Sequence, residues 1–155
     1  MVRVRAYRSE DWSDLCRIHD SARLDELRYT VGTDAFKTLE QTAQEEGLFD
    51  GAVLVAERHG QVLGFVAFMP NEITWLYVDP GNYRSGLASA LIEVVLAETT
   101  GDLSVEMLEG NAAALAFYQK FGFTVTARKE GNLVGNESFQ TVGLTLQLFR
   151  AGTVA

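Results

Sequence analysis

The stretch EGNAAALAFYQKFGF, residues 109–123, carries the most specific pattern in this sequence. It is expected to form a short helix, and Asn111 is a residue type that caps helix N-termini. Tyr118 follows Asn111 by seven residues, nearly two helical turns, so the two side chains share a face to within about 20°. The three alanines after Asn111 leave room beside that face. Tyr118 would offer a hydroxyl of pKa ~10 as a proton donor to a leaving anion; the alternative is that Asn111 only caps and Tyr118 only packs.

Upstream, the sequence WLYVDPGNYRSGLAS, residues 75–89, places a strand ahead of a turn and a helix. A helix N-terminus has backbone N–H groups without partners and a partial positive charge. Because Gly86 and Ala88 carry little or no side chain, a phosphate could approach the backbone there, which predicts a pyrophosphate cradle. The pattern lacks the Gly-Lys-Ser/Thr of a P-loop and the three glycines of a dinucleotide fingerprint. Its alternative is a helix start with small packing residues.

Apolar alternation and helical spacing place the remaining elements around these two patterns. Ser9 is expected to cap the first helix, and the His59-Gly60 pair to turn a hairpin. The order β-α-α-β-β-β-α-β-α-β-β predicts a mixed α/β sheet with helices on both faces. The expected ranges are strand 2–7, helices 10–28 and 34–46, strands 52–57, 62–69 and 73–78, helix 85–99, strand 103–108, helix 111–121 and strands 123–128 and 139–149, with a polar loop at 129–138.

Composition narrows the class of protein. The 155 residues suit one domain over residues 1–155, with 47% hydrophobic and 22% charged residues, as in ordinary soluble proteins. Thirteen basic against 21 acidic residues give a net charge of −8, which disfavours nucleic acid as a partner. An acidic surface could favour cationic amines or basic peptides, although solubility is the simpler explanation of the charge. A single cysteine, Cys16, rules out an internal disulfide and a multi-cysteine metal site. Without an apolar run of ~18 residues or a signal-peptide pattern, we expect a cytoplasmic protein with no membrane partner.

The two patterns together resemble the GNAT family of N-acetyltransferases, which use acetyl-CoA. The resemblance spans nearly the whole chain and is strongest over residues 72–123. The pattern N-x-x-A-x-x-F-Y-x-x-x-G-F, which begins at Asn111, is highly specific at this position. Gly86 and Ala88 match the family's Gln/Arg-x-x-Gly-x-Gly/Ala, whereas Tyr83 stands where Gln or Arg is usual. Because this loop acts largely through main-chain N–H groups, we expect binding to survive the departure.

The resemblance implies a GNAT-like fold, a mixed and mostly antiparallel sheet of six to seven strands with helices on both faces. It implies that the fourth strand and the following strand splay apart, so that an extended ligand pairs with a free strand edge. The helix start would then hold the pyrophosphate, and Asn111 would contact the cofactor arm. The implied acetyl-CoA-binding residues are Leu76, Tyr77, Val78, Arg84, Ser85, Gly86, Leu87, Ala88, Ser89 and Asn111, with no metal ligand.

The implied reaction is direct attack of a primary amine on the thioester through a tetrahedral intermediate. A lysine-like amine of pKa ~10.4 is almost wholly protonated at pH 7, so a base is useful. Tyr118 resembles the family's proton donor to the expelled thiolate. Glu72 resembles the base in the histone-acetylating branch, and Glu106 is a second candidate. Each acid has the alternative of being a solvated strand residue.

The acceptor is left open between a small-molecule amine and an amine of a peptide or protein. Family specificity lies largely in the first two helices and the late hairpin, here residues 23–36 and 129–138. Tyr29 and Phe36 could wall a pocket, and the acids Asp25 and Glu26 could attract a cation; the alternative is that these are core or surface residues, as such residues more often are. The histidines His19 and His59 are interpreted as a helix residue and a turn residue.

Three other functions are alternatives to acetyl transfer. A non-catalytic acyl-CoA-binding regulatory module is disfavoured by the retention of Tyr118. An acetylating toxin that acts on charged tRNA is disfavoured by the net charge of −8. If the chain were an interaction domain without a cofactor, packing alone would have to account for both sequence patterns. A homodimer through the last strands, residues 143–149, is a further expectation.

Overall fold

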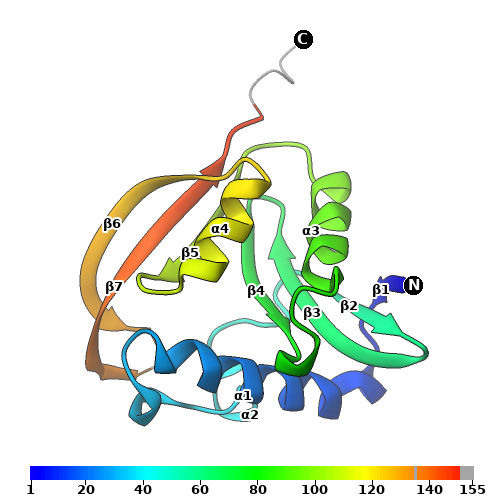
Figure 1. Cartoon of the computed structure of the whole chain (residues 1–155), viewed down its shortest axis with the longest axis horizontal. Coiled ribbons are helices and arrows are strands. Elements are labelled where there is room, and N and C mark those ends of the chain that lie inside the picture. Colours follow the sequence, from blue (N-terminus) through cyan, green and yellow to red (C-terminus); the bar gives the residue numbers. More distant parts are fainter. Residues whose placement is uncertain (135, 151–155) are drawn as a thin grey trace.

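The computed structural model describes residues 1–134 and 136–150 and arranges them around a seven-stranded sheet (Figure 1). The strand order is β1-β2-β3-β4-β5-β7-β6, and every neighbouring pair is antiparallel except the parallel pair β4 and β5. The predicted mixed, mostly antiparallel sheet is therefore confirmed. The strands are β1 (Val2–Ala6), β2 (Ala52–Arg58), β3 (Gln61–Met69), β4 (Glu72–Val78), β5 (Leu103–Leu108), β6 (Thr124–Leu133) and β7 (Asn136–Leu148).

Helices cover both faces of the sheet, as predicted. On one face, α1 (Trp12–Arg28) and the short α2 (Leu39–Thr42) share a core with β2, β3 and β4. On the other face, α3 (Leu87–Glu98) and α4 (Ala112–Lys120) bury their apolar residues against β2 to β5 and β7. Within the described residues, no helix is long and apolar enough to cross a membrane. Three single turns of 3-10 helix complete the elements: η1 (Ser9–Asp11), η2 (Thr33–Ala35) and η3 (Pro80–Asn82).

Two expected elements are corrected. The helix expected over residues 34–46 is broken into η2 and the four-residue α2, because Phe36 is extended and Thr38 starts a new helix with a capping box. The polar loop expected at 129–138 is mostly strand, since β6 runs to Leu133 and β7 begins at Asn136. Backbone pairing between β6 and β7 orders this ribbon although its side chains are largely exposed. Residue 135 of that loop lies outside the described residues.

The start of α1 is fixed by an ion pair rather than by the expected Ser9 cap. Ser9 is the first residue of η1, and the side chain of Asp11 accepts a hydrogen bond of 2.8 Å from the backbone N–H of Arg8. Arg5 on β1 donates two hydrogen bonds to the Asp11 carboxylate, at 2.8 and 2.9 Å, and a third to Glu57 on β2 at 3.0 Å. Asp11 is 4% exposed. This pair joins the sheet to the helix that forms one wall of the site.

We expect Asp11→Ala to lower the free energy of unfolding by about 3 kcal/mol, because it leaves the Arg5 guanidinium largely buried with one partner fewer. Urea denaturation at pH 7 measures this, and Glu10→Ala, an exposed neighbouring acid, is the control. The Arg5 guanidinium holds the pKa of Asp11 below its ordinary value. The contribution of Asp11 is therefore present above the ordinary carboxyl pKa and is lost as the pH falls through the lowered one. Equal stabilities of the two variants at pH 7 would contradict this role.

Strands β4 and β5 separate soon after they meet. Their pairing is limited to Glu72 with Ser104 and Ile73 with Val105, although both strands continue beyond these residues. On the other side of β4, the register with β3 shifts at Ala67 and leaves Thr74 as an extra residue, whose hydroxyl donates to the carbonyl oxygen of Ala67 at 3.0 Å. From this bulge onward, one edge of β4 has no strand beside it. The sheet therefore opens at the strand that the sequence singled out.

Candidate active site

The open edge of β4 comprises the backbone of Leu76, Tyr77 and Val78. All three pair with β3 on one side, and none is paired with β5 on the other. The bulge at Thr74 also changes which side chains share a face, because it adds one residue to the alternation. Trp75 and Tyr77 consequently face the same cavity as Glu72. The separation of β4 from β5 that the resemblance implies is therefore present, and binding of an extended ligand at this edge stays a prediction.

The loop after β4 leads into an open helix N-terminus. Gly86, the N-cap of α3, has φ +86°, and a side chain there would meet no atom within 4 Å. The first N–H group of the helix with an acceptor in the preceding loop is that of Ala90, which donates to the carbonyl of Gly86 at 3.0 Å. The N–H groups of the first turn are therefore available to an anion. The structure brings these six residues of the predicted cradle together: Arg84, Ser85, Gly86, Leu87, Ala88 and Ser89.

Hydrogen bonds from other elements fix this loop. Arg58 on β2 donates to the carbonyl oxygen of Ser85 at 2.6 Å, and the Ser85 hydroxyl donates to the carbonyl oxygen of Asn82. Asp79 accepts from the side chain of Asn82 at 2.8 Å and from Arg17 of α1 at 3.3 Å. The cradle is thus preorganised by the sheet and by α1.

Asn111 and Tyr118 lie on α4, which follows β5. The side chain of Asn111 caps α4 by accepting from the N–H of Ala114 at 3.1 Å, and its amide donates to Glu26 Oε2 at 3.4 Å. Tyr118 is 7% exposed, with its ring edge-on to Phe117 and Phe123 at centroid distances of 5.3 and 5.5 Å. Asn111 therefore does cap and Tyr118 does pack, and Asn111 also contacts the carboxylate of Glu26. Burial and the charge of Glu26 raise the pKa of Tyr118, so its hydroxyl keeps its proton at neutral pH.

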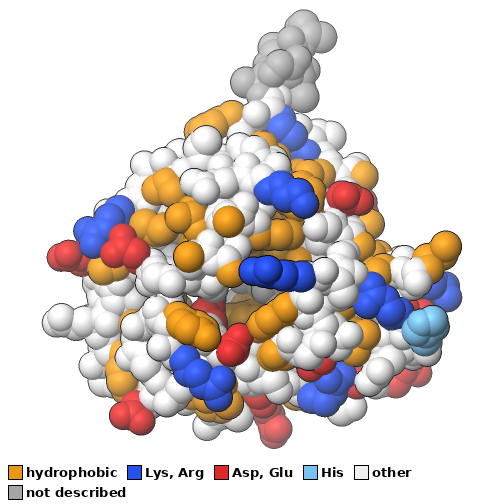
Figure 2. All heavy atoms as spheres, viewed as in Figure 1, with side chains coloured by type: hydrophobic (Ala, Val, Ile, Leu, Met, Phe, Trp, Pro, Cys, Tyr) orange, Lys and Arg blue, Asp and Glu red, His pale blue; other side chains and the backbone are white. Residues whose placement is uncertain are grey.

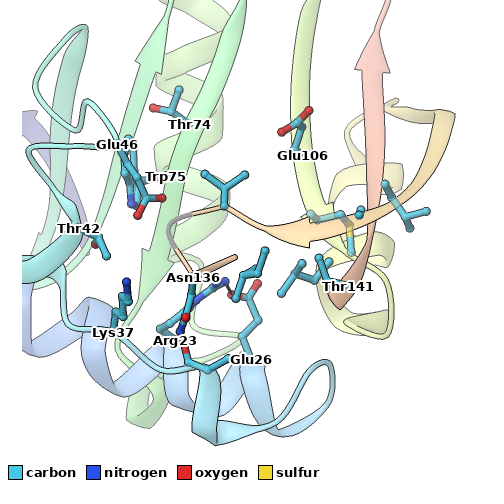
Figure 3. Close-up of a pocket in the computed structure, with 18 of the residues that line it drawn as sticks. Arg23, Glu26, Lys37, Thr42, Glu46, Thr74, Trp75, Glu106, Asn136 and Thr141 are labelled. Carbon is cyan, nitrogen blue, oxygen red and sulfur yellow. Dashed lines mark hydrogen bonds and ion pairs between the residues drawn. The ribbon is translucent and has the colours of Figure 1, made fainter. Parts of the chain in front are cut away.

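A cavity of about 820 Å³ opens beside β4 and β5 (Figure 3). Figure 3 shows Glu106 on β5 and Thr74 on β4 at the gap between the strands, with Arg23 and Glu26 rising from α1. The tip of the β6–β7 ribbon forms the far wall, and Asn136 pins it to η2 by donating to the carbonyl oxygen of Ala35 at 2.9 Å. The described lining carries five carboxylates and three cationic side chains, namely Glu26, Glu45, Glu46, Glu72 and Glu106 against Arg23, Lys37 and Lys129.

The structure places some of the predicted site residues at the cavity and others away from it. Glu72 and Glu106 both line the cavity, and burial together with the charge of Glu106 raises the pKa of Glu72. Tyr118 is not among the described residues that line the cavity, but belongs to the core beneath α3 and α4. Of the two acids expected to attract a cation, Glu26 faces the cavity, whereas Asp25 pairs with Arg28 at 3.4 Å.

The aromatic wall predicted from the sequence is wrong. Tyr29 is 69% exposed, and Phe36 packs with Leu27 and Leu133 in a small separate cluster. Their neighbours Ala35 and Lys37 line the cavity instead. Tyr29 is the C-cap of α1 and Phe36 is the extended residue after η2, so neither side chain is held on a helix face toward the cavity.

The sequence interpretation also missed a polar row on α1. His19, Arg23 and Glu26 are spaced by four and three residues, which places them on one helix face, and all three line the cavity. His19 is 4% exposed, its Nδ1 lies 2.9 Å from the carboxylate of Asp20, and its ring is edge-on to Tyr77 at 4.9 Å. Burial lowers the pKa of His19, so the ring is neutral at pH 7. The spacing 19, 23, 26 is the signal that would have revealed this face.

The face of the molecule in Figure 2 has Lys and Arg side chains intermixed with Asp and Glu, and apolar side chains around a central hollow. Within the described residues, no group of three or more His, Cys, Asp or Glu side chains could hold a metal ion.

The chain is similar to known proteins in sequence and in fold. Residues 49–125 match the family described as "Acetyltransferase (GNAT) domain". The peptidyl-lysine N-acetyltransferase YjaB of Escherichia coli (strain K12) is 29% identical over 139 residues, which cover 87% of this chain and 90% of that protein. The uncharacterized N-acetyltransferase YafP of the same strain is 26% identical over 125 residues, 79% of this chain and 81% of that protein.

A solved structure gives the same fold. The putative acetyltransferase yncA from Salmonella typhimurium, determined with its cofactor acetyl-CoA, superposes with a TM-score of 0.71 at 20% identity. The superposition covers 99% of this chain and 96% of that chain.

Proposed function

Because this chain belongs to the GNAT family and is an acetyl-CoA-dependent N-acetyltransferase, we propose that it transfers the acetyl group to a cationic primary amine that enters the cavity beside β4. One observation carries the proposal: the separation of β4 from β5 leaves a free strand edge on the border of an acid-rich cavity. An acyl group held at that edge would meet an amine held in the cavity. The thioester of acetyl-CoA supplies the activated acyl group.

The residues of the opened edge and the cradle fit acetyl-CoA. The free backbone of Leu76, Tyr77 and Val78 offers hydrogen bonds to the pantetheine arm and to the acyl oxygen. The open N-terminus of α3, from Arg84 to Ser89, offers N–H groups to the pyrophosphate. Asn111 at the start of α4 borders the same space through its contact with Glu26.

Proton movements are assigned to two side chains. Glu72 takes the proton that the ammonium of the acceptor must lose before its nitrogen adds to the acyl carbon in direct attack. Tyr118 gives a proton to the sulfur as the tetrahedral intermediate collapses and the carbon–sulfur bond breaks. The raised pKa values of both groups support these roles. A raised pKa makes the Glu72 carboxylate a stronger base, and it keeps the Tyr118 hydroxyl protonated until the sulfur needs its proton.

The acceptor class follows from charge. Five carboxylates against three cations in the described lining favour a cationic amine over an anionic one. YjaB, which covers most of this chain, is described as a peptidyl-lysine N-acetyltransferase. We therefore propose a lysine side chain or a small amine of similar length as the acceptor.

Two measurements test the function. Calorimetric titration with acetyl-CoA, desulfo-CoA and ATP should give micromolar binding of acetyl-CoA and much weaker binding of ATP. Thiol release should then be followed with lysine-containing peptides, polyamines, aminoglycosides and neutral amino acids as acceptors, with mass spectrometry to locate the acetyl group. Absence of acetyl-CoA binding up to millimolar concentration would overturn the proposal, and turnover only with anionic acceptors would overturn the acceptor class.

The role of Glu72 has its own prediction. We expect Glu72→Gln to lower kcat/KM by about 100-fold and to abolish the acidic limb of its pH profile, because the general base is lost. Glu106→Gln should instead keep activity and move that limb to lower pH, since removal of the neighbouring charge lowers the pKa of Glu72. An unchanged acidic limb in both variants would exclude Glu72 as the base.

A further inference from the structure

Glu26 occupies the point where three elements of the site meet. It lies in the last turns of α1, and its side chain is 17% exposed. Its Oε1 accepts hydrogen bonds from Arg23 at 2.5 Å and from the Tyr77 hydroxyl on β4 at 3.4 Å. Its Oε2 accepts from the amide of Asn111, the N-cap of α4, at 3.4 Å. One carboxylate therefore joins the acceptor-side helix to β4 and to α4.

Tyr77 and Asn111, which donate to Glu26 from outside α1, both belong to the acetyl-CoA side of the site. Asn111 has its two side-chain atoms committed in different directions, the oxygen to the helix cap and the nitrogen to Glu26. Glu26 thereby determines which way the amide is turned. Tyr77 is held between Glu26 at its hydroxyl and the edge of the His19 ring. Since the backbone of Tyr77 is part of the open edge, its side chain anchors that edge to α1.

The charge of Glu26 also acts on Tyr118. The ring of Tyr118 contacts Phe117 and Phe123. The charged side chain that acts on its pKa is that of Glu26 from α1, which pairs with Arg23. The negative charge of Glu26 opposes ionisation of Tyr118 and Tyr77, and burial acts in the same direction. Arg23 pairs with Glu26 and limits this effect. Glu72, in contrast, has Glu106 as its charged neighbour.

We propose that Glu26 is a positioning residue for acetyl transfer, which holds Asn111 and Tyr77 in the arrangement that acetyl-CoA requires. This inference rests on the proposed function. The contacts of 3.4 Å are long for hydrogen bonds, and we expect them to shorten when acetyl-CoA fills the space between β4 and α4. Glu26 transfers no proton in this scheme.

The first test is Glu26→Gln, compared with Glu10→Gln. Glu10 is exposed in η1, directly before α1, so it matches the change in side chain and in charge away from the cavity. We expect Glu26→Gln to lower kcat by about 10-fold, to weaken acetyl-CoA binding several-fold and to move the alkaline limb of the kcat profile to lower pH. The control should leave all three unchanged. An alkaline limb that stays in place would exclude the action of Glu26 on Tyr118.

The second test exchanges the two partners. Asn111→Asp places two carboxylates in contact and should weaken acetyl-CoA binding more than Glu26→Gln does. The double variant Glu26→Gln with Asn111→Asp reverses donor and acceptor, keeps a good helix cap and restores one negative charge near Tyr118. We expect it to bind acetyl-CoA more tightly than Asn111→Asp alone and to recover the alkaline limb. Additive losses in the double variant would overturn the proposal.

The outcomes separate this inference from the proposed function. If the wild-type protein neither binds nor turns over acetyl-CoA, the proposed function fails. If it does both and the two tests show no coupling between positions 26 and 111, only the role of Glu26 fails. Should Glu26→Gln not fold, Tyr77→Phe decides, because it removes the hydroxyl that donates to Glu26 and keeps the ring. It should weaken acetyl-CoA binding, and unchanged binding would exclude the anchoring by Glu26.

Discussion

Tyr118→Phe is expected to lower kcat by about 100-fold while leaving the Kd for acetyl-CoA within about threefold, because general-acid catalysis by one side chain contributes at least that much. Phe keeps the ring contacts with Phe117 and Phe123 that hold this position. The variant loses only the hydroxyl whose pKa is raised by burial and by Glu26. Initial rates of thiol release with a saturating amine acceptor, together with calorimetry, separate the two quantities.

The pH profile sharpens this expectation. In the wild-type protein, kcat should fall at alkaline pH as Tyr118 loses its proton, and the raised pKa places that fall above the range of a free tyrosine. Tyr118→Phe should lack this limb. Tyr7→Phe is the control, because Tyr7 packs against Phe49 outside the cavity. Unchanged kcat in Tyr118→Phe would refute the acid role and leave Tyr118 as a packing residue.

Local pattern was sufficient for the parts of the site that depend on one element. Asn111 and Tyr118 are placed by helical spacing on α4, and the cradle needs only a strand, a turn and a helix start with small residues. The His59-Gly60 turn was predicted correctly, with both residues at positive φ. In each case, the information lies within about fifteen consecutive residues.

The parts that could not be predicted depend on contacts between distant segments. Strict alternation along β4 would put Ile73 and Trp75 on one face, whereas the bulge opposite Ala67 leaves Ile73 in the core beneath α3 and Trp75 in the core beneath α1. Glu26 meets Asn111 across 85 positions of sequence, and nothing local indicates that pairing. Residues 129–133 and 136–138 of the β6–β7 ribbon are mostly polar, which is typical of a loop, and backbone pairing makes them strand.

Ser89→Glu should abolish most acetyl-CoA binding without destabilising the fold. Ser89 lies in the first turn of α3, where an acidic side chain interacts favourably with the helix dipole by up to about 1 kcal/mol. The same carboxylate would repel the pyrophosphate at the N-terminus. Two charges roughly 5 Å apart near a protein surface repel by about 3 kcal/mol, which corresponds to about a 100-fold loss of affinity. The added carboxylate therefore stabilises α3 and weakens the binding of acetyl-CoA.

Calorimetry with acetyl-CoA and thermal unfolding measure these two effects in the same preparation. Ala97→Glu is the matched control, since it adds the same charge to an exposed position at the other end of α3. It should leave acetyl-CoA binding unchanged, because salt screens a charge more than about 10 Å away. Ser89→Ala should cost little affinity if main-chain N–H groups hold the pyrophosphate. Full binding by Ser89→Glu would place the pyrophosphate elsewhere, and equal losses in both Glu variants would trace the effect to net charge rather than to the cradle.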